Sequence, residues 1–272
     1  MRHPFFASNR PLVFAHRGGA ALAPENTLAA FETGLGHGAD GIELDVRVSR
    51  DGIVVVHHDR TLDRTTDRTG DVAGLEAHAL ARVDAGYRFG SDGNHPFRGR
   101  GIGIPRLAEV LARFRDSRVI VEMKIDSIEF AAAVVEVVRR ADAIERVCVG
   151  SFSRRGLRHI RSVAPGLATS AGREEVRWAL YRSWCRWPVS QPAYFGYQIP
   201  ERAEATRVVS PRFVRDAHSA GLGVQVWTVD TEDAARRLLS WGVDGLISDR
   251  PDVIVPLVRG QAGRAGQAGG AR

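Results

Sequence analysis

Short runs of apolar, often β-branched residues recur along the chain and alternate with longer amphipathic segments. A run that is apolar at consecutive positions is typical of a strand buried on both faces, as in a parallel sheet covered by helices. Nine such runs are expected to be strands, at residues 12–16, 41–46, 53–58, 118–124, 146–152, 166–172, 193–199, 223–229 and 244–248.

Most of the segments between these runs have apolar residues at helical spacing, and several are followed by the glycine that commonly ends a helix. Clear examples are residues 27–35, 106–114, 129–141, 210–221 and 231–242. Strands and helices that alternate over 272 residues predict an α/β protein built as a (β/α)8 TIM barrel. A doubly wound open sheet is the alternative.

Two segments depart from this alternation. Residues 59–105 are rich in Gly, Asp, Arg and His, and we interpret them as an insertion after the third strand. Residues 260–272 are a Gly/Ala/Gln/Arg stretch that cannot bury a core, so a disordered tail is expected there. The remaining chain, residues 10–259, is predicted to form one barrel domain.

The connection between the second and third strands is too short for a parallel crossover, which needs about a dozen residues. It contains Asp51-Gly52, a strong signal for a two-residue hairpin loop. In that register Asp45 lies opposite His58, with Glu43 diagonal to it on the same face; a shift by one residue sets Glu43 opposite His58. Either register brings the three side chains together.

Side chains two residues apart lie on the same face of a strand, so Glu43 pairs with Asp45 and Glu122 with Lys124. Carboxylates that meet inside a barrel repel each other, by about 4 kcal/mol for charges ~4 Å apart at an effective dielectric of 20. They require a cation. Oxygen ligands suit Mg²⁺ or Ca²⁺, and the sequence has no cysteine or histidine pair that suggests a zinc site instead.

Further polar residues follow the first strand, where Asn26 or Thr27 is expected to cap the next helix. The carboxyl ends of barrel strands form the active site. One rim should therefore gather His16, Arg17, Glu43, Asp45, His58 and Glu122. Two histidines, a bound cation and an arginine supply an acid, a base, a Lewis acid and a phosphate anchor, which is a set suited to hydrolysis of an anionic phosphodiester.

Charge and composition narrow the class of partner. A net charge of +6 and a pI near 10.1 favour anionic partners. Nucleic-acid binding is not expected, because no recognisable module is present and the arginines are scattered.

Cys148 and Cys185 lie in unrelated segments, which argues against a disulfide framework. With no signal-peptide pattern and no apolar stretch of membrane-spanning length, a cytoplasmic protein, at most peripheral to a membrane, is expected.

The motifs HRGG, PENT, IELDV, DGIVVVHHD, VEMK, VQVWTV and VDGLISD occur in this order. Together they resemble the glycerophosphodiester phosphodiesterase family, a group of (β/α)8 barrels with an insertion after the HD motif. The resemblance covers nearly all of residues 12–252. It implies metal binding by Glu43, Asp45 and Glu122, acid/base roles for His16 and His58, phosphate contacts from Arg17 and Lys124, and a place beside the substrate for Asn26, with Glu25 orienting that loop.

Two positions depart from the family pattern. HHD stands where a single His before Asp is usual, and strand parity favours His58 over His57 as the catalytic residue. Asp230 follows WTV where the family often has Asn, which puts a hydrogen-bond donor role at that position in doubt. The attacking nucleophile is either water or the 2-hydroxyl of the substrate's own glycerol.

Lys124 is the only lysine among 38 lysine and arginine residues. An ammonium is a compact point charge, whereas a guanidinium is a wide planar fork that crowds a metal-bound phosphate. Lys124 is therefore expected to neutralise charge that develops on a phosphoryl oxygen. Trp227, at the end of a late strand, is expected to line the pocket near the glycerol.

Residues 178–199 contain Trp178, Tyr181, Trp184 and Trp187 at a spacing of three, interleaved with arginines. Such rings either pack into the core as part of a helix that covers the barrel, or form a peripheral membrane contact. The second interpretation makes a lysophospholipid the substrate, through a lysophospholipase D-type activity. The alternative from another functional class is a catalytically silent barrel that binds phospholipid, which metal-dependent turnover would exclude.

Overall fold

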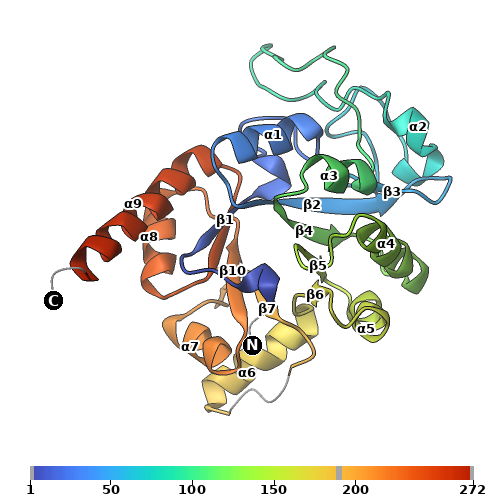
Figure 1. The fold of residues 1–272 in the computed structure, drawn as a ribbon. Coiled ribbons are helices and arrows are strands. Elements are labelled where there is room, and N and C mark those ends of the chain that lie inside the picture. The colour runs from blue at the N-terminus through green and yellow to red at the C-terminus, as the bar shows by residue number, and fades with distance from the viewer. Residues whose placement is uncertain (1–2, 188–191, 270–272) are drawn as a thin grey trace.

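A computed structural model describes residues 3–187 and 192–269, with side chains up to residue 260. Eight parallel strands form the barrel (Figure 1). In spatial order they are β6 (Ala168–Thr169), β5 (Val147–Ser151), β4 (Arg118–Met123), β2 (Gly41–Val48), β1 (Leu12–Ala15), β11 (Gly245–Ser248), β10 (Gly223–Trp227) and β7 (Gly196–Pro200). A parallel bridge from Ser170 to Gly196 joins the two end strands. The TIM-barrel prediction is confirmed, and the open-sheet alternative is wrong.

Helices surround the barrel on its outside (Figure 1). They are α1 (Leu28–Gly36), α3 (Leu107–Arg113), α4 (Ile128–Arg140), α5 (Arg154–Val163), α6 (Arg173–Cys185), α7 (Pro211–Ser219), α8 (Glu232–Ser240) and α9 (Pro251–Gly269). Hydroxyls of Thr27, Ser127 and Ser210 accept hydrogen bonds from backbone N–H groups in the first turns of α1, α4 and α7. These caps satisfy donors that have no partner inside the helix, and so fix where each helix begins.

The end of the barrel at which the strands begin is closed by the N-terminal segment. A short 3₁₀ helix, η1 (Pro4–Phe6), inserts Phe5 and Phe6 into an apolar cluster of strand residues from the barrel interior. An added Cβ on Gly196 or Gly223 would lie 2.6 Å from the Phe6 ring, so both strands depend on glycine to admit that ring. The barrel therefore includes residues before position 10, where its start was predicted.

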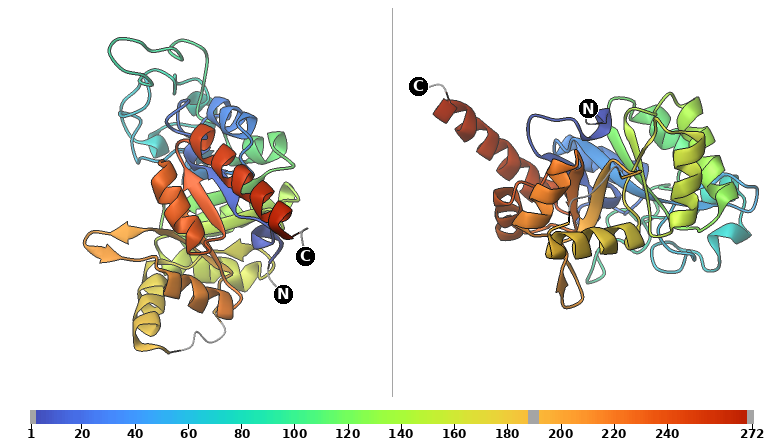
Figure 2. Two further views of the ribbon diagram at one scale, coloured as in Figure 1. Left: turned by 90° about the vertical axis from the view of Figure 1, so that its left-hand side faces the viewer. Right: turned by 90° about the horizontal axis from the view of Figure 1, so that it is seen from below.

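The segment after β3 (Val54–Val56) forms a small layer of its own, with η3 (Val72–Gly74) and α2 (Ala77–Leu80). Its apolar side chains surround Val55 of β3 in a separate cluster: Leu62, Val72, Ala77, Leu80, Val83, Ala85 and Ile104. Figure 1 shows this layer beside α1 and α3. A second small feature, the hairpin of β8 (Arg202–Ala203) and β9 (Thr206–Arg207), projects from the barrel in Figure 2.

The carboxyl-terminal helix differs from the predicted tail. Helix α9 continues to Gly269, so residues 260–269 are helical where disorder was expected, and residues 270–272 lie outside the described part of the chain. The composition does not explain this helix, because four of the residues 260–269 are Gly, which disfavours helix. Among the described residues, no helix combines the length and the apolar character that crossing a membrane requires.

Candidate active site

Three carboxylates meet at the rim formed by β2 and β4. Asp45 and Glu122 are direct neighbours in the parallel register, and Glu43 lies two residues before Asp45 on the same face. Ligand oxygens of the three side chains lie within 4.8 Å of one another. Burial, and then the charge of Asp45, raise the pKa of Glu43 to about 7. The predicted convergence of these carboxylates is therefore present in the structure.

Positive groups surround Asp45, the most buried member of this cluster. The Lys124 ammonium lies 2.9 Å from Asp45 Oδ1 and 2.7 Å from Glu122 Oε1, and Arg17 Nε lies 3.3 Å from Asp45 Oδ2. Burial alone would raise the pKa of Asp45. The charges of Lys124, Arg17 and His58 outweigh burial and hold that pKa below its usual range.

This cluster has the donor set of a site for a hard cation. Its three ligands are carboxylate oxygens, which suit Mg²⁺ and Ca²⁺. The residues therefore fit one divalent cation, without selecting between the two metals.

His16 and Arg17 lie on η2 (His16–Gly18), the turn that directly follows β1. His16 Nδ1 lies 2.7 Å from Asp249 Oδ1, and His16 Nε2 lies 3.8 Å from Glu43 Oε2. Burial disfavours the charged imidazole, but Glu43 and Asp249 outweigh it and raise the pKa of His16 to about 9. The histidine is thus held between the carboxylate cluster and Asp249.

Asp230 fixes Asp249 in turn. Its Oδ1 accepts hydrogen bonds from Ser248 Oγ (3.0 Å) and from the Asp249 backbone N–H (2.8 Å). Asp230 therefore accepts hydrogen bonds at a position where the Asn that is frequent in the family could also donate them.

The loop between η2 and α1 contacts the cluster through Asn26. Asn26 Nδ2 donates to Asp45 Oδ2 (2.8 Å), and Asn26 Oδ1 accepts from the Asp45 backbone N–H (3.1 Å). Thr27, the other expected cap, takes the capping position of α1. The Arg17 backbone N–H donates to Glu43 Oε2, and Arg17 Nη1 donates to Glu25 Oε1, both at 3.0 Å. This loop thus holds two of the three carboxylates.

The expected hairpin register is wrong in both of its forms. Val46 pairs with Val56 and Val48 with Val54, so the turn is a three-residue loop over residues 50–52, with Gly52 at a φ of 78°. Glycine adopts this left-handed conformation at no steric cost, which makes the longer loop accessible. Asp45 consequently lies opposite His57, whose backbone N–H donates to the Asp45 carbonyl.

The two neighbouring histidines have separate environments. The buried His57 ring lies 3.1 Å from the carbonyl of Thr61, through Nε2. The chain leaves the strand after Val56, and this brings His58 rather than His57 among the charges around Asp45. His58 Nδ1 lies 2.6 Å from Asp59 Oδ1. His58 therefore reaches the cluster through the loop that follows β3 and not through strand parity.

Aromatic rings border the site on the β5 and β10 side. Trp227 is partly buried at the end of β10, and its ring lies 6.5 Å from that of Phe152, which is 51% exposed. Lys124 Nζ and the guanidinium carbon of Arg173 each lie 5.7 Å from the Phe152 ring. Phe152, which sequence reasoning did not single out, thus connects the charged cluster with the start of α6.

The other residues that sequence reasoning did not assign to the site are Asp249 and Asp59. Asp249 directly follows β11, the strand beside β1, so its place at the carboxyl end of a barrel strand was the available signal. Asp59 follows His58 in the HD motif. Arg64, from the insertion, donates to both Asp59 and Glu25.

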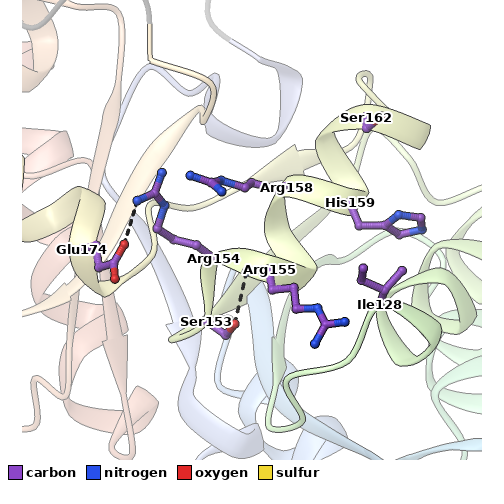
Figure 3. Close-up of a pocket in the computed structure, with 8 residues that line it drawn as sticks. All are labelled: Ile128, Ser153, Arg154, Arg155, Arg158, His159, Ser162 and Glu174. Atoms are coloured by element: carbon purple, nitrogen blue, oxygen red, sulfur yellow. Dashed lines mark hydrogen bonds and ion pairs between the residues drawn. The ribbon is translucent and has the colours of Figure 1, made fainter.

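The rings of residues 178–187 are on the outside of the molecule. Trp178, Tyr181, Trp184 and Trp187 are 48–66% exposed, so the interpretation of these rings as core is wrong. Residues 188–191 of this segment lie outside the described part. A separate surface pocket of about 640 Å³ follows the outer side of α5, between α4 and the start of α6, and contains Arg154, Arg155 and Arg158 (Figure 3).

Comparison with known proteins agrees with this geometry. The sequence model of the glycerophosphoryl diester phosphodiesterase family matches residues 16–253. A glycerophosphodiester phosphodiesterase of Caldanaerobacter subterraneus is 33% identical, over 92% of this chain and 98% of its own. A probable glycerophosphodiester phosphodiesterase 2 of Mycobacterium tuberculosis is also 33% identical, over 92% of both chains.

Among solved structures, a phosphodiesterase of Oleispira antarctica in complex with its product sn-glycerol 3-phosphate superimposes with a TM-score of 0.73 at 27% identity, covering 92% of this chain and 97% of that one. A glycerophosphodiester phosphodiesterase of Agrobacterium tumefaciens gives a TM-score of 0.73 at 30% identity, over 90% and 98% of the two chains.

Proposed function

Because the chain belongs to the glycerophosphoryl diester phosphodiesterase family and is a phosphoric diester hydrolase, we propose that it cleaves glycerophosphodiesters to an alcohol and glycerol 3-phosphate with a divalent cation and two histidines. The observation that carries this proposal is the meeting of three carboxylates, two histidines, an arginine and a lysine at one rim of the barrel. The product bound by the Oleispira relative supports glycerol 3-phosphate as the product here.

Glu43, Asp45 and Glu122 would hold the cation, either Mg²⁺ or Ca²⁺. When bound, such an ion polarises a phosphoryl oxygen and lowers the pKa of a coordinated hydroxyl. Asn26 keeps Asp45 oriented through its two hydrogen bonds, and the Arg17 backbone N–H does the same for Glu43. Outer contacts of this kind typically change metal affinity or activity by about 10–100-fold.

His16 and His58 would exchange the two protons of the reaction. One histidine removes the proton of the attacking hydroxyl, and the other protonates the leaving alcohol. Asp249 and Asp59 lie at the Nδ1 atoms of these two rings, which leaves each Nε2 for proton exchange. The nucleophile is water or the substrate's own 2-hydroxyl, and a cyclic phosphate product would identify the second route.

Arg17 and Lys124 would contact the phosphate, where positive charge stabilises the developing negative charge. Both side chains are mostly buried beside the carboxylates, so they act where water screens charge poorly. Asn26 would lie beside the substrate, and Trp227 would line the glycerol side of the pocket.

A lysophospholipid is the second candidate substrate. The half-exposed Phe152 ring beside Lys124 favours it, because an acyl chain that leaves the site would meet an apolar surface there. A cytoplasmic protein with peripheral membrane contact remains part of this proposal. The two cysteines, which form no disulfide with each other, suit a reducing compartment.

The test is hydrolysis of glycerophosphocholine and lysophosphatidylcholine in parallel, with free choline and free glycerol 3-phosphate both followed. Wild type and His16→Ala are compared in EDTA and after addition of Mg²⁺ or Ca²⁺. Metal-dependent release of both products from the soluble diester, lost in His16→Ala, is expected. Turnover of the lysolipid alone would favour the second candidate, and turnover that persists in EDTA would exclude the metal mechanism.

A further inference from the structure

Exposed aromatic rings line the outward side of α6 and continue just past its end, and we name them the α6 ridge: Trp178, Tyr181 and Trp184 on the helix, and Trp187 two residues beyond it. The three rings on the helix meet edge to face, with centroids 6.2 Å apart for Trp178 and Tyr181 and 5.7 Å apart for Tyr181 and Trp184. The helix packs on the barrel through the opposite side, where Ala179 and Ser183 are buried. The ridge is therefore not needed to attach α6 to the barrel.

Exposed apolar residues concentrate at this helix. Seven large hydrophobic side chains are exposed among the described residues, and the ridge accounts for four of them. Isolated exposed hydrophobic residues are ordinary, whereas a contiguous group of large rings marks an interaction surface.

The ridge is also cationic. Arg173, Arg177 and Arg186 are exposed beside the rings, and within the part of the chain described here none of them forms an ion pair with a carboxylate. The two acidic residues of the first turn are already neutralised, because Glu174 pairs with Arg154 and Glu175 with Arg161, each at 2.7 Å. The surface therefore combines apolar rings with uncompensated positive charge.

The basic surface extends onto α5. In the pocket shown in Figure 3, Arg154 pairs with Glu174 of α6, the carboxylate among the lining residues, while the exposed Arg155 points toward Ile128 of α4 and Arg158 is also exposed. The positive charge thus reaches beyond one helix face, as attraction to an extended anionic surface requires.

The helix that carries the ridge begins beside the diester site. Arg173, the first residue of α6, lies 5.7 Å from the same Phe152 ring that faces Lys124. Trp178 follows five residues later, about 7.5 Å along the helix axis at the ~1.5 Å rise per residue of an α-helix. A surface that binds the ridge would therefore lie close to the site.

The size of the ridge argues against a protein partner. Four rings of ~150–250 Å² each, a little over half exposed, present roughly 500 Å², whereas a stable protein interface needs about 800 Å² from each partner. Tryptophan and tyrosine with flanking arginine are typical of the membrane–water interface, where the rings lie at the depth of the lipid head groups.

We propose that the α6 ridge docks on an anionic phospholipid bilayer. The aromatic rings insert at the boundary between head groups and acyl chains, and Arg177 and Arg186 contact lipid phosphates. Docking brings the mouth beside Phe152 to the membrane surface. Lipid binding itself is independent of the proposed catalysis, so the two can fail separately.

The test is co-sedimentation of the full chain with vesicles of phosphatidylcholine alone or mixed with phosphatidylglycerol. The wild type should sediment with the mixed vesicles and lose binding as salt is added. The double variant Trp178→Ser/Trp184→Ser should bind at least about 10-fold less, and Arg177→Gln/Arg186→Gln should lose the preference for anionic lipid. Hydrolysis of soluble glycerophosphocholine should stay at the wild-type level in both variants.

The matched control is Ile53→Ser/Val163→Ser, which alters two exposed hydrophobic residues outside the ridge and should bind as wild type does. Wild type that remains in the supernatant, or equal binding by the ridge and control variants, would overturn the proposal. Equal binding to both kinds of vesicle would overturn the role of charge. A dimer in solution that the ridge variant abolishes would show an interface between copies of the chain instead.

Discussion

At the scale of single residues, Lys124 is the position where composition and geometry agree most closely. The chain has one lysine, and its ammonium contacts both Asp45 and Glu122 inside the carboxylate cluster. Strand parity predicted the face on which Lys124 lies, and the structure adds the two contacts. An ammonium can approach two carboxylates from one point, whereas a guanidinium must present a plane.

Lys124→Arg should therefore retain the positive charge but lose the simultaneous contact with Asp45 and Glu122. We expect kcat/KM for glycerophosphocholine to fall by about 10²-fold, the range found when one stabilising donor of a transition state is removed. The urea midpoint of unfolding should change little. The control is Arg140→Lys, which exchanges the same two residue types on the exposed side of α4, away from the site. It should keep the wild-type kcat/KM. Full activity in Lys124→Arg would show that a guanidinium can replace the ammonium at this position.

Residue-level prediction failed where side-chain position depends on a loop. Parity along a strand identifies the face of Glu43, Asp45 and Glu122, because the side-chain period of a strand is fixed. It cannot locate His58, which follows the end of β3, or Asp249, which follows β11. For such residues the chain direction depends on turn conformation and tertiary contacts.

At the scale of elements, the nine predicted strands all occur, because short apolar runs separated by helical patterns leave few alternatives. The register of the β2–β3 hairpin was missed by one residue, since Asp51-Gly52 is compatible with loops of two or three residues. The orientation of the α6 rings was also beyond the sequence, because aromatic residues at helical spacing fit a buried or an exposed face equally well.

The contact between α1 and η2 shows how an element positions catalytic groups. An added Cβ on Gly34 of α1 would lie 2.5 Å from Ala15 Cβ and 2.6 Å from the Gly18 carbonyl oxygen. Gly34→Ala should therefore displace the turn that carries His16 and Arg17. We expect a loss of about 1–3 kcal/mol in the free energy of unfolding, as overpacking typically costs, and a fall of about 10-fold in kcat/KM.

Gly36→Ala provides the matched control for this prediction. It lies on the same helix, and nothing is within 4 Å of the added Cβ. Its unfolding free energy and its kcat/KM should both stay near the wild-type values. If the two alanine variants behave alike in urea unfolding and in turnover, the close approach of α1 to η2 is not what positions the site.

At the scale of the whole molecule, one end of the barrel carries the candidate active site, and the opposite end is closed by a buried apolar cluster that stabilises the fold. Phe5 is fully buried among strand residues at the end away from the carboxylates, and its ring stacks on Phe14 with centroids 5.7 Å apart. Phe5→Ala should reduce the free energy of unfolding by about 3–5 kcal/mol, the usual cost of truncating a buried Phe. KM for glycerophosphocholine should be unchanged below the melting transition. Ile53→Ala, at an exposed site, should lower the free energy of unfolding by less than about 0.5 kcal/mol, as surface substitutions usually do. An equal loss in both variants would show that Phe5 does not stabilise the end of the barrel that it closes.

The insertion is joined to the rim by Arg64. Its guanidinium donates to both oxygens of Glu25 at 2.7 Å, and to Asp59 at 2.5 Å. Glu25 also accepts from Arg17, and Asp59 lies at the Nδ1 of His58, so one side chain fixes the partners of two site residues. The fold should depend little on this network, because partly exposed ion pairs typically contribute only about 0–1 kcal/mol.

Arg64→Gln should accordingly leave the unfolding midpoint nearly unchanged and lower kcat/KM by about 10-fold, as loss of an outer contact in a metal site commonly does. Arg60→Gln is the control within the same insertion, because Arg60 is 78% exposed and pairs only distantly with Asp71, at 3.5 Å. A large fall in stability for Arg64→Gln would assign the network to folding. Equal kcat/KM in the two variants would mean that the insertion covers the rim without positioning His58 or Arg17, and that those residues depend on the barrel alone.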